Sequence, residues 1–369
     1  MCLPKSTDVF VVGGGPAGLA AAIAASRRGL RATVADPEQA PVDKACGEGI
    51  MPDGLAAARA LGIELEGLGQ PFAGIRFCHG DDRVEAQFPH GHGLGIRRVT
   101  LHRTLVEQAQ RAGVRMLWGA KVGGIGNGRV YLGGSAVDAG WIVGADGANS
   151  AVRLWAGLND SYRDTRRFGF RRHYAAAPWS PWMEVHWGDA CQLYLTPTGA
   201  REICAVAISG DSHLRLENVL PRFPEVAERL RGVPEITPER GAVTASRRLR
   251  QVTRGRVALV GDASGSVDAI TGEGLCLLFQ QALALGDALA AGDLARYEAA
   301  HWAIGQRPAR MAGLMLLLDR RARLRRWAIR ALAADPRLFS RMLAMHVEDH
   351  SRARFFLNGL SLGWKLLTV

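Results

Sequence analysis

The chain has 369 residues, of which 48% are hydrophobic, 22% are charged and 45 are glycine. This composition is close to the average for globular proteins, and it excludes disordered and fibrous classes. The six cysteines contain no C-x-x-C pair and do not cluster with histidines along the chain. We therefore expect neither a metal site nor a disulfide framework, and we expect a reducing, cytoplasmic compartment.

The ends of the chain and its charge distribution add two expectations. The first residues lack the basic, apolar and small-residue pattern of a signal peptide. We also expect no bilayer-spanning segment of about 18 residues, since the best apolar run, residues 311–318, stops at Asp319. The net charge of +11 is concentrated late in the chain, where residues 301–369 hold 13 Arg or Lys and 4 Asp or Glu.

The first predicted unit is β-α-β. A short strand at residues 8–12 leads into a glycine-rich turn and an alanine-rich helix at residues 19–28, which Gly29 ends. A second strand at residues 30–36 ends in Asp36. The turn between the first strand and the helix reads Gly13-Gly14-Gly15-Pro16-Ala17-Gly18.

This strand-turn-helix context makes the G-x-G-x-x-G pattern a dinucleotide-binding fingerprint. Gly13 permits the tight turn, Gly15 lets the backbone approach a pyrophosphate, and Gly18 lets the helix pack closely on the strand. The helix N-terminus supplies free N–H groups for phosphates. Asp36, eighteen residues after Gly18, is placed to accept hydrogen bonds from a ribose.

Further elements follow in chain order. Leucine spacing predicts a helix at residues 99–112, and an apolar run predicts a strand at residues 140–147. The region at 168–209 alternates in the manner of strands and predicts an antiparallel sheet. A buried strand at residues 256–260 precedes a long helix at residues 275–291, and the rest of the chain is predicted to be helical.

Two more segments carry a family resemblance. Residues 144–153, GADGANSAVR, resemble the GADGxxSxxR motif of flavoprotein monooxygenases, which is the second motif in this chain. Residues 255–263, which contain Gly261-Asp262, resemble a third motif of the same proteins. In order and spacing the three motifs resemble the superfamily that includes p-hydroxybenzoate-hydroxylase-like monooxygenases, flavin halogenases and geranylgeranyl reductases. The resemblance spans about residues 5–290 and implies bound FAD, with NAD(P)H or a reductase partner as the electron donor.

The resemblance implies an α/β fold, α+β overall. A Rossmann-like FAD-binding domain would comprise residues 1–70, 97–165 and 250–295. An inserted antiparallel β-sheet substrate domain would comprise residues 71–96 and 166–249, and a helical C-terminal region residues 296–369.

The same resemblance places residues at the flavin. Asp262 would meet the ribityl chain, Asp146 would lie in the second motif's loop, and Arg98, or its neighbour Arg97, would contact FAD. The segment Gly272-Glu273-Gly274-Leu275 opens the long helix, so that Gly272, Gly274 and Leu275 would lie beside the flavin ring.

The loop Lys44-Ala45-Cys46-Gly47-Glu48 resembles the K-x-C-G segment of geranylgeranyl reductases. Lys44 would help to hold the cofactor and to tune the thiol of Cys46. Cys46 and Glu48 are the candidate catalytic residues.

The leading functional hypothesis is a monooxygenase that acts on a hydrophobic small molecule through reduced FAD and a C4a-hydroperoxide in a dry pocket. The candidates for pocket side chains are Phe170, Trp182, Val185, Trp187 and Tyr194.

Two alternatives stay open. One is reduction of prenyl C=C bonds, although residues 194–197 lack the tryptophan of the reductases' Y-x-W-x-F-P strand. The other is a non-enzymatic lipid carrier of the same fold. Halogenation is disfavoured, because Phe72 stands where halogenases place a lysine.

The basic tail also has two interpretations. Six arginines between residues 320 and 330 surround leucines and Trp327, and residues 355–364 form a second apolar stretch. This composition suits a helix packed over the substrate cavity with its arginines in water. It also suits peripheral contact with an anionic membrane. Nucleic acid is not expected as a partner, because no reading module accompanies the charge.

Overall fold

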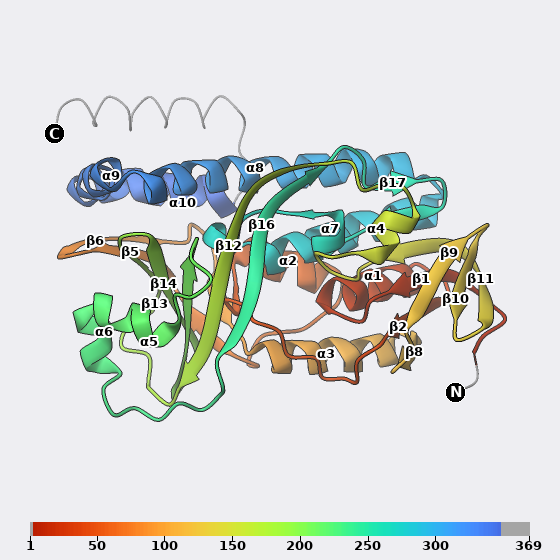
Figure 1. Ribbon diagram of the computed structural model, residues 1–369, viewed down its shortest axis with the longest axis horizontal. Coiled ribbons are helices and arrows are strands. Elements are labelled where there is room, and N and C mark those ends of the chain that lie inside the picture. Colours follow the sequence, from red (N-terminus) through yellow and green to blue (C-terminus); the bar gives the residue numbers. More distant parts are fainter. Residues whose placement is uncertain (1–2, 348–369) are drawn as a thin grey trace.

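The computed structural model describes residues 3–347, which form two large sheets joined by a long helical layer (Figure 1). The apolar stretch at residues 355–364 lies outside the described residues. The strands are β1 (Ser6–Val12), β2 (Ala32–Asp36), β3 (Gly49–Ile50), β4 (Gln70–Phe72), β5 (Gly74–His79), β6 (Asp82–Gln87), β7 (Gly93–Gly95), β8 (Arg115–Trp118), β9 (Val122–Gly126), β10 (Arg129–Leu132), β11 (Ser135–Gly144), β12 (Ser161–Tyr174), β13 (Trp182–Trp187), β14 (Cys191–Gly199), β15 (Glu202–Ser209), β16 (Arg240–Leu249), β17 (Thr253–Arg254), β18 (Val257–Leu259) and β19 (Gly265–Ser266). The helices are α1 (Pro16–Ser26), α2 (Pro52–Ala60), α3 (Arg98–Arg111), α4 (Ala151–Trp155), α5 (Leu216–Val219), α6 (Pro224–Arg229), α7 (Gly274–Ala291), α8 (Leu294–Arg320), α9 (Ala322–Ala334) and α10 (Pro336–Val347), with 3-10 turns η1 (Leu220–Arg222), η2 (Gly261–Ser264) and η3 (Ala269–Thr271).

The first sheet has the order β17-β18-β11-β1-β2-β8, and β9 and β10 continue from β11. Strands β18, β11, β1, β2 and β8 pair in parallel, as crossover connections through helices require. Their carboxyl ends therefore meet at one edge, where ligands bind in folds of this kind. The β-α-β unit and the Rossmann-like fold class predicted from the sequence are confirmed.

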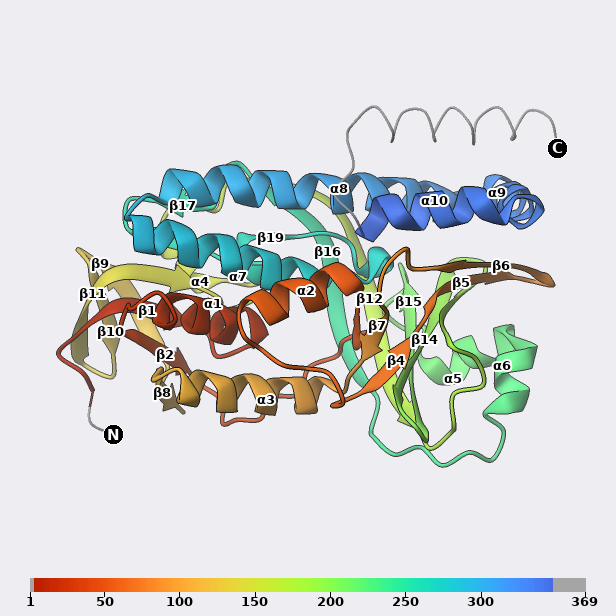
Figure 2. The ribbon, with the colours of Figure 1, turned by 180° about the vertical axis from the view of Figure 1, so that it is seen from behind.

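The second sheet has the order β19-β16-β12-β15-β14-β13-β5-β6. Its pairs are antiparallel except for β13 and β5, which run in the same direction. The antiparallel sheet expected over residues 168–209 is confirmed, because β12, β15, β14 and β13 pair antiparallel in that order. The parallel pair joins this sheet to β5, and there the N–H of Ala73 donates to the carbonyl of Pro181. A small third sheet, β3-β7-β4, lies between the two large ones (Figure 2).

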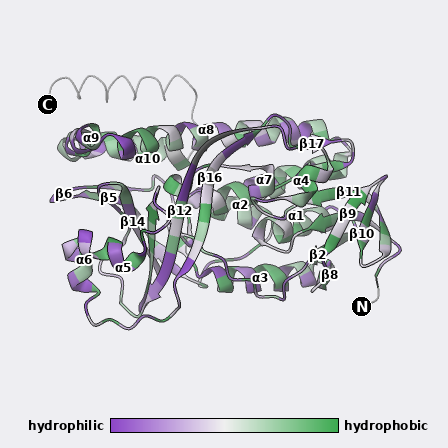
Figure 3. Cartoon of the chain, in the orientation of Figure 1, coloured by the Kyte–Doolittle hydropathy of each residue, from purple (hydrophilic) through white to green (hydrophobic). Residues whose placement is uncertain are grey.

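Helix α7 is the interior helix of the first half. It is long and apolar enough to cross a bilayer by length and composition, which corrects the expectation that no such segment exists. Most of it, 61%, is buried inside the structure, however. A Cβ at its Gly286 would lie only 2.8 Å from the Cβ of Ala24 on α1, so the two helices pack at close range. In Figure 3, α1 is largely hydrophobic, as this packing requires.

The last three helices cover the second sheet. Helix α8 runs along α7 and past it, and α9 and α10 lie over β5 and β6 (Figures 1 and 2). Arg325 of α9 is 1% exposed, donates to the carbonyl of Asp319 at 3.1 Å, and pairs with Asp189 at 2.9 Å. This arginine, expected among surface cations, is therefore part of the packing between α8, α9 and the sheet.

We predict that Arg325→Leu destabilises the fold by about 1–3 kcal/mol, because it removes a buried group that hydrogen-bonds the end of α8. Denaturant unfolding measures the change. Arg326→Leu, at the exposed neighbouring position, is the matched control and is expected to change the unfolding free energy by less than about 0.5 kcal/mol. Equal stability of the two variants would show that Arg325 does not anchor helices α8, α9 and α10, which together form the helical cap.

Candidate cofactor and substrate site

The glycine-rich turn lies where three backbone segments meet. A Cβ at Gly18 would stand 1.9 Å from the carbonyl oxygen of Gly13, and one at Gly13 would stand 2.4 Å from the carbonyl oxygen of Ala145. Gly15 differs, because a Cβ there would meet nothing within 4 Å. Gly15 is the extended N-cap of α1, with Pro16 as its first residue. The turn thus leaves open space in front of the N–H groups of α1, including that of Ala17.

Asp36 at the end of β2 is fixed by two backbone groups. Its Oδ2 accepts from the N–H of Gly14 at 2.7 Å, and its Oδ1 accepts from that of Glu38 at 2.8 Å. Each carboxylate oxygen has a second lone pair. Asp36 is therefore oriented at the carboxyl edge of the sheet and keeps acceptor capacity for a hydroxyl group.

The GADGxxSxxR segment joins the cofactor motifs to one another. The Oδ2 of Asp146 caps α4 by accepting from Ala151 and Val152 at 2.7 and 3.1 Å. Arg153, 3% exposed, donates to the carbonyl of Ala148 at 2.8 Å and to that of Ala263 at 3.0 Å. The motif arginine thus ties the second motif to the third across 110 residues of sequence.

Three predicted site residues from separate segments converge. Asp262 is accessible in this structure, yet protein surrounds it closely enough that burial raises the pKa of its carboxyl. The charges of Lys44 and Arg98 oppose that rise, which places both cations near it. Arg98 is buried at the start of α3, whereas Arg97 pairs with Glu202 at 3.4 Å. Of the two adjacent arginines, Arg98 is the one beside Asp262.

The start of α7 forms another side of the candidate cofactor site. Gly272 adopts a left-handed backbone conformation with a φ of 68°, and a Cβ at Gly274 would meet nothing within 4 Å. Leu275 follows and is buried. Gln281, one turn and a half further on, accepts from the N–H of Gly261 at 2.8 Å and so holds α7 to the Gly261-Asp262 turn.

Cys46 does not have the activated thiol that was expected. Burial raises its pKa most, and the carboxylate of Glu48 raises it further, while the charges of Arg98 and Arg171 oppose the shift. Burial and Glu48 dominate the surroundings of this thiol, and the expected influence of Lys44 stays a prediction. Cys46 is therefore a neutral thiol near neutral pH.

Glu48 lies in a buried polar cluster. Its Oε1 accepts from the N–H of Arg98 at 2.9 Å, and its Oε2 lies 2.6 Å from Nε2 of His173. The guanidinium of Arg171 donates to Nδ1 of His173 at 3.1 Å, so that Nε2 carries the proton that Glu48 accepts. Glu48 also has a φ of 60°, which is rare outside glycine. This cluster fixes the Cys46 loop against the second sheet.

Ligand atoms of Glu48, His173 and Cys204 lie within 4.8 Å of one another, so a histidine and a cysteine distant in sequence do cluster in space. The ligand set is nevertheless a poor one for a divalent cation. The fully buried guanidinium of Arg171 binds His173 and lies 3.9 Å from Glu48. A positive charge at that place opposes a second one.

An apolar cavity of about 760 Å³, a volume that includes open solvent, lies between the second sheet and the helical cap. Val185, Trp187 and Tyr194 line it, as do residues of α8, α9 and α10. Of the other predicted pocket residues, Phe170 packs under Arg215 instead, and Trp182 lines a different pocket. The cavity also reaches Ile270 and Thr271, directly before the start of α7.

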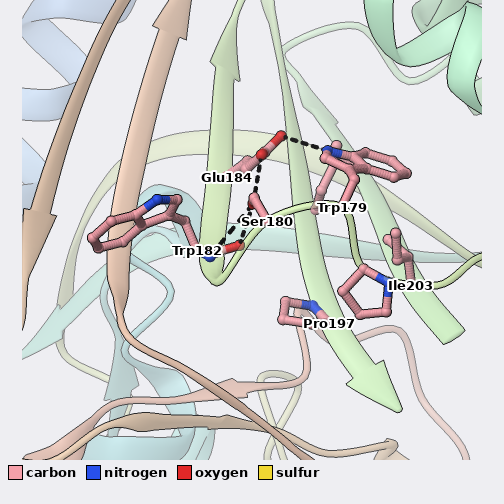
Figure 4. Close-up of a pocket in the computed structure, with 8 residues that line it drawn as sticks. Trp179, Ser180, Trp182, Glu184, Pro197 and Ile203 are labelled. Atoms are coloured by element: carbon pink, nitrogen blue, oxygen red, sulfur yellow. Dashed lines mark hydrogen bonds between the residues drawn. The ribbon is translucent and has the colours of Figure 1, made fainter. Parts of the chain in front are cut away.

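The second pocket, shown in Figure 4, is smaller, at about 200 Å³. It contains Glu184, whose carboxylate is occupied by Ser180 at 2.8 Å, His186 at 2.9 Å and Arg76 at 2.7 Å. Burial alone would raise the pKa of Glu184, but these partners lower it to about 2. The carboxylate is thus a structural anion, and this pocket is the weaker candidate for a substrate.

One residue of interest was missed by the sequence analysis. Glu273, between Gly272 and Gly274, is 2% exposed and faces Arg307 of α8 at 3.9 Å. Its place inside the T-G-E-G segment was a usable signal, but only the glycines of that segment were considered.

Comparison with known proteins agrees with this geometry. Residues 6–294 match the FAD binding domain family. The menaquinone reductase of Mycolicibacterium smegmatis is 27% identical over 362 residues, covering 85% of each chain. The 3-hydroxybenzoate 6-hydroxylase of Polaromonas naphthalenivorans is 28% identical, covering 78% of this chain and 80% of that one. Among solved structures, a flavoprotein/dehydrogenase from Cytophaga hutchinsonii superposes with a TM-score of 0.81 at 16% identity, covering 92% of both chains.

The fold and the convergent motifs define an FAD-dependent oxidoreductase. The chain belongs to the FAD binding domain family, within the superfamily of flavin monooxygenases, halogenases and geranylgeranyl reductases. The residues present fit the cofactor, because Gly15, Gly47 and Gly274 all border space that a Cβ would enter without contact.

We predict that Gly15→Ala and Gly18→Ala fail in different ways. A methyl group at position 15 meets no atom of residues 3–347 within 4 Å, so that variant should fold with near wild-type stability but bind FAD at least about tenfold more weakly. A methyl group at position 18 meets the carbonyl of Gly13, so that variant should lose stability itself. Thermal unfolding of the apoproteins and FAD titration separate the two effects. If Gly15→Ala still binds FAD tightly, the pyrophosphate does not bind beside Gly15.

Proposed function

We propose that the protein is an FAD-dependent monooxygenase whose substrate is a hydrophobic small molecule bound in the cavity under α8, α9 and α10. The observation that carries this proposal is the cavity itself. Its walls are apolar side chains apart from Thr271 and the ring polar groups of Trp187 and Tyr194, and the hydroxyl of Tyr194 already donates to Ile270 at 2.8 Å. Such a wall excludes water, which oxygen insertion requires.

In this proposal three surfaces hold the cofactor. The turn and α1 bind the pyrophosphate and Asp36 binds the ribose. Lys44, Arg98, Asp146 and Asp262 line the middle of the site, and Asp262 orients the ribityl chain. The start of α7 lies against the flavin ring. The proposed FAD contacts are Gly13, Gly15, Pro16, Ala17, Gly18, Asp36, Lys44, Arg98, Asp146, Gly261, Asp262, Gly272, Gly274 and Leu275.

Bound FAD supplies the redox chemistry, with electrons from NAD(P)H or a reductase partner. The chain's own residues orient the substrate and exclude water. Cys46, on the loop proposed to lie beside the flavin, contributes a neutral thiol, and Glu48 positions that loop through His173 and Arg98. The division into residues 1–70, 97–165 and 250–295, residues 71–96 and 166–249, and residues 296–369 is retained as a proposal.

Reduction of an isolated C=C bond is the second candidate. The Lys44-Ala45-Cys46-Gly47 loop favours it, and so does the Thr271-Gly272-Glu273-Gly274 segment, because both resemble segments of geranylgeranyl reductases. The similarity to a menaquinone reductase supports it as well. The same apolar cavity would accept an extended apolar chain, so the reaction and not the substrate's polarity distinguishes the two candidates.

We predict that the purified protein is yellow and releases FAD on denaturation. With an apolar substrate panel of phenols, aromatic polyketides and prenyl quinones, ¹⁸O₂ should label the product, and no product should form without oxygen. A prenyl chain reduced under anaerobic conditions, with no label incorporated in air, would instead establish the reductase. Asp262→Ala is the matched variant, and it should lose FAD more readily than Asp146→Ala, whose carboxylate caps α4.

We further propose that the exposed side of the helical cap contacts anionic membranes, so that this cytoplasmic protein takes its apolar substrate at a membrane surface. Arg320, Arg321, Arg323 and Arg326 are exposed there, and Leu317 is 46% exposed beside them. In Figure 3, α9 carries hydrophilic and hydrophobic residues together. Arginines beside an apolar strip are what an interfacial helix needs.

We predict salt-sensitive binding to vesicles that contain anionic lipid, since surface charge is screened over about 8–10 Å at physiological salt. Arg323→Glu with Arg326→Glu should abolish this binding. The control is Arg103→Glu with Arg111→Glu on α3, at the opposite side of the molecule (Figure 1), and it should bind as the wild type does. Co-sedimentation measures both. If the wild type does not bind anionic vesicles even at low salt, the helical cap only packs on the second sheet, and the membrane proposal is wrong.

A further inference from the structure

A largely buried ionisable cluster lies between α2, α7 and α8, with Glu273 as its deepest member. It contains Asp53 of α2, Glu273 at the N-cap of α7, and Arg307 of α8. Arg307 donates to Asp53 at 2.8 Å and lies 3.9 Å from Glu273. Gln280 of α7 also donates to Asp53, at 3.0 Å. Asp53 is therefore paired with two donors, whereas Glu273 is the deeper carboxyl and the weaker partner of the arginine.

The cluster borders the substrate cavity through one hydroxyl group. Thr271 is itself a lining residue of the cavity, and its hydroxyl donates to the carbonyl of Asp268 at 3.4 Å. Its side chain also lies close enough to Glu273 to lower the pKa of that carboxyl. Met51, two residues before Asp53, lines the same wall. Glu273 is thus separated from the cavity by a single hydroxyl, at the end of the cavity where α7 begins.

The environment of Glu273 keeps its proton bound. Burial raises its pKa most, Arg307 opposes the rise, the carboxylate of Asp53 adds to it, and Thr271 opposes it, with the pKa at about 8. Cys276 is the further titratable group that faces it, from the next turn of α7. At neutral pH Glu273 is a carboxylic acid with a proton to give.

We infer that Glu273 is the proton reservoir of the reaction in the cavity, and that Thr271 carries its proton across the cavity wall. The hydroxyl of Thr271 turns from the carbonyl of Asp268, gives its proton to the acceptor in the cavity and takes the proton of Glu273. One O–H bond of Glu273 breaks, and its carboxylate then faces Arg307. No electrons move in this step. Glu273 acts through another residue and is therefore a positioning residue, and Thr271 is the group that touches the reactant.

The inference rests on the proposed function only in placing the chemistry in this cavity. When one oxygen atom enters a substrate, the other leaves as water and needs a proton. When a C=C bond is reduced, one carbon takes a hydride and the other takes a proton. Both reactions draw their electrons from NAD(P)H or a reductase partner, and both need one proton at the cavity wall.

The test uses holoenzyme without substrate, with dioxygen as the probe. Reoxidation of the photoreduced holoenzyme by dioxygen forms hydrogen peroxide and consumes protons, and stopped-flow absorbance follows it between pH 6 and 10. In the wild type the rate should fall above about pH 8. Glu273→Gln and Thr271→Val should be at least about tenfold slower at pH 7 and should not show this fall, because a general acid contributes factors of this order. Thr271→Ser should restore the rate, and Glu64→Gln, at an exposed site after α2, should match the wild type.

A second measurement needs neither flavin nor turnover. A carboxyl whose pKa in the folded protein is about 8, against 4.5 in the unfolded chain, costs stability progressively as the pH rises from 4.5 to 8. Glu273→Gln lacks this cost, so its melting temperature should rise relative to that of the wild type over this range. Parallel stability curves would show that Glu273 is ionised at neutral pH and would overturn the inference.

The remaining outcomes of the two measurements also test the inference. Diverging stability curves with unchanged reoxidation profiles would overturn the relay, because the proton would be present but unused. Failure of ¹⁸O incorporation refutes the proposed monooxygenase alone, since both measurements on Glu273 are made without an organic substrate.

Discussion

The close contact between backbone segments at the end of β1 is the constraint on which the half of the structure that contains the first sheet depends. The carbonyl of Gly13 occupies the space of a Gly18 side chain, and the carbonyl of Ala145 occupies that of a Gly13 side chain. A side chain at either position would collide with backbone, so the close approach of the helix to the two strands requires glycine at both. Arg153 then fixes the third segment by bridging Ala148 and Ala263. Three motifs far apart in sequence thereby become one rigid edge of the sheet.

The substrate half follows a different physical rule. Its cavity is made by apolar faces that meet incompletely, the second sheet below and α8 to α10 above. A buried ion-pair cluster links those faces, in which Arg167 pairs with Asp268 at 3.4 Å and with Asp319 at 3.3 Å. Because Asp268 precedes η3 and Asp319 lies in the last turn of α8, this buried arginine connects the segment before α7 to the helical cap.

Short sequence patterns predicted the features that depend only on residues close together in the chain. The glycine spacing and Asp36 predicted the β-α-β unit, since each residue acts within its own turn. Contacts over long sequence distances were not predictable in the same way. The period-two pattern proposed both Phe170 and Tyr194 for the pocket, but which face is covered depends on helices more than a hundred residues later. Burial and Glu48 raise the pKa of Cys46, and burial and Asp53 raise the pKa of Glu273. In both cases the rise outweighs an opposing charge, that of Arg171 or Arg307, whose proximity no spacing rule contains.

The order of the elements along the chain has a consequence for biosynthesis. Residues 13–275 contain every proposed contact with FAD, whereas the helices that roof the cavity come from residues 294–347. On the ribosome the nucleotide site is therefore complete while the apolar faces of β5, β13 and β14 are still bare. A nascent chain with an uncovered apolar sheet is prone to aggregate. Early capture of FAD, which stabilises only the folded half, would protect the chain during this interval.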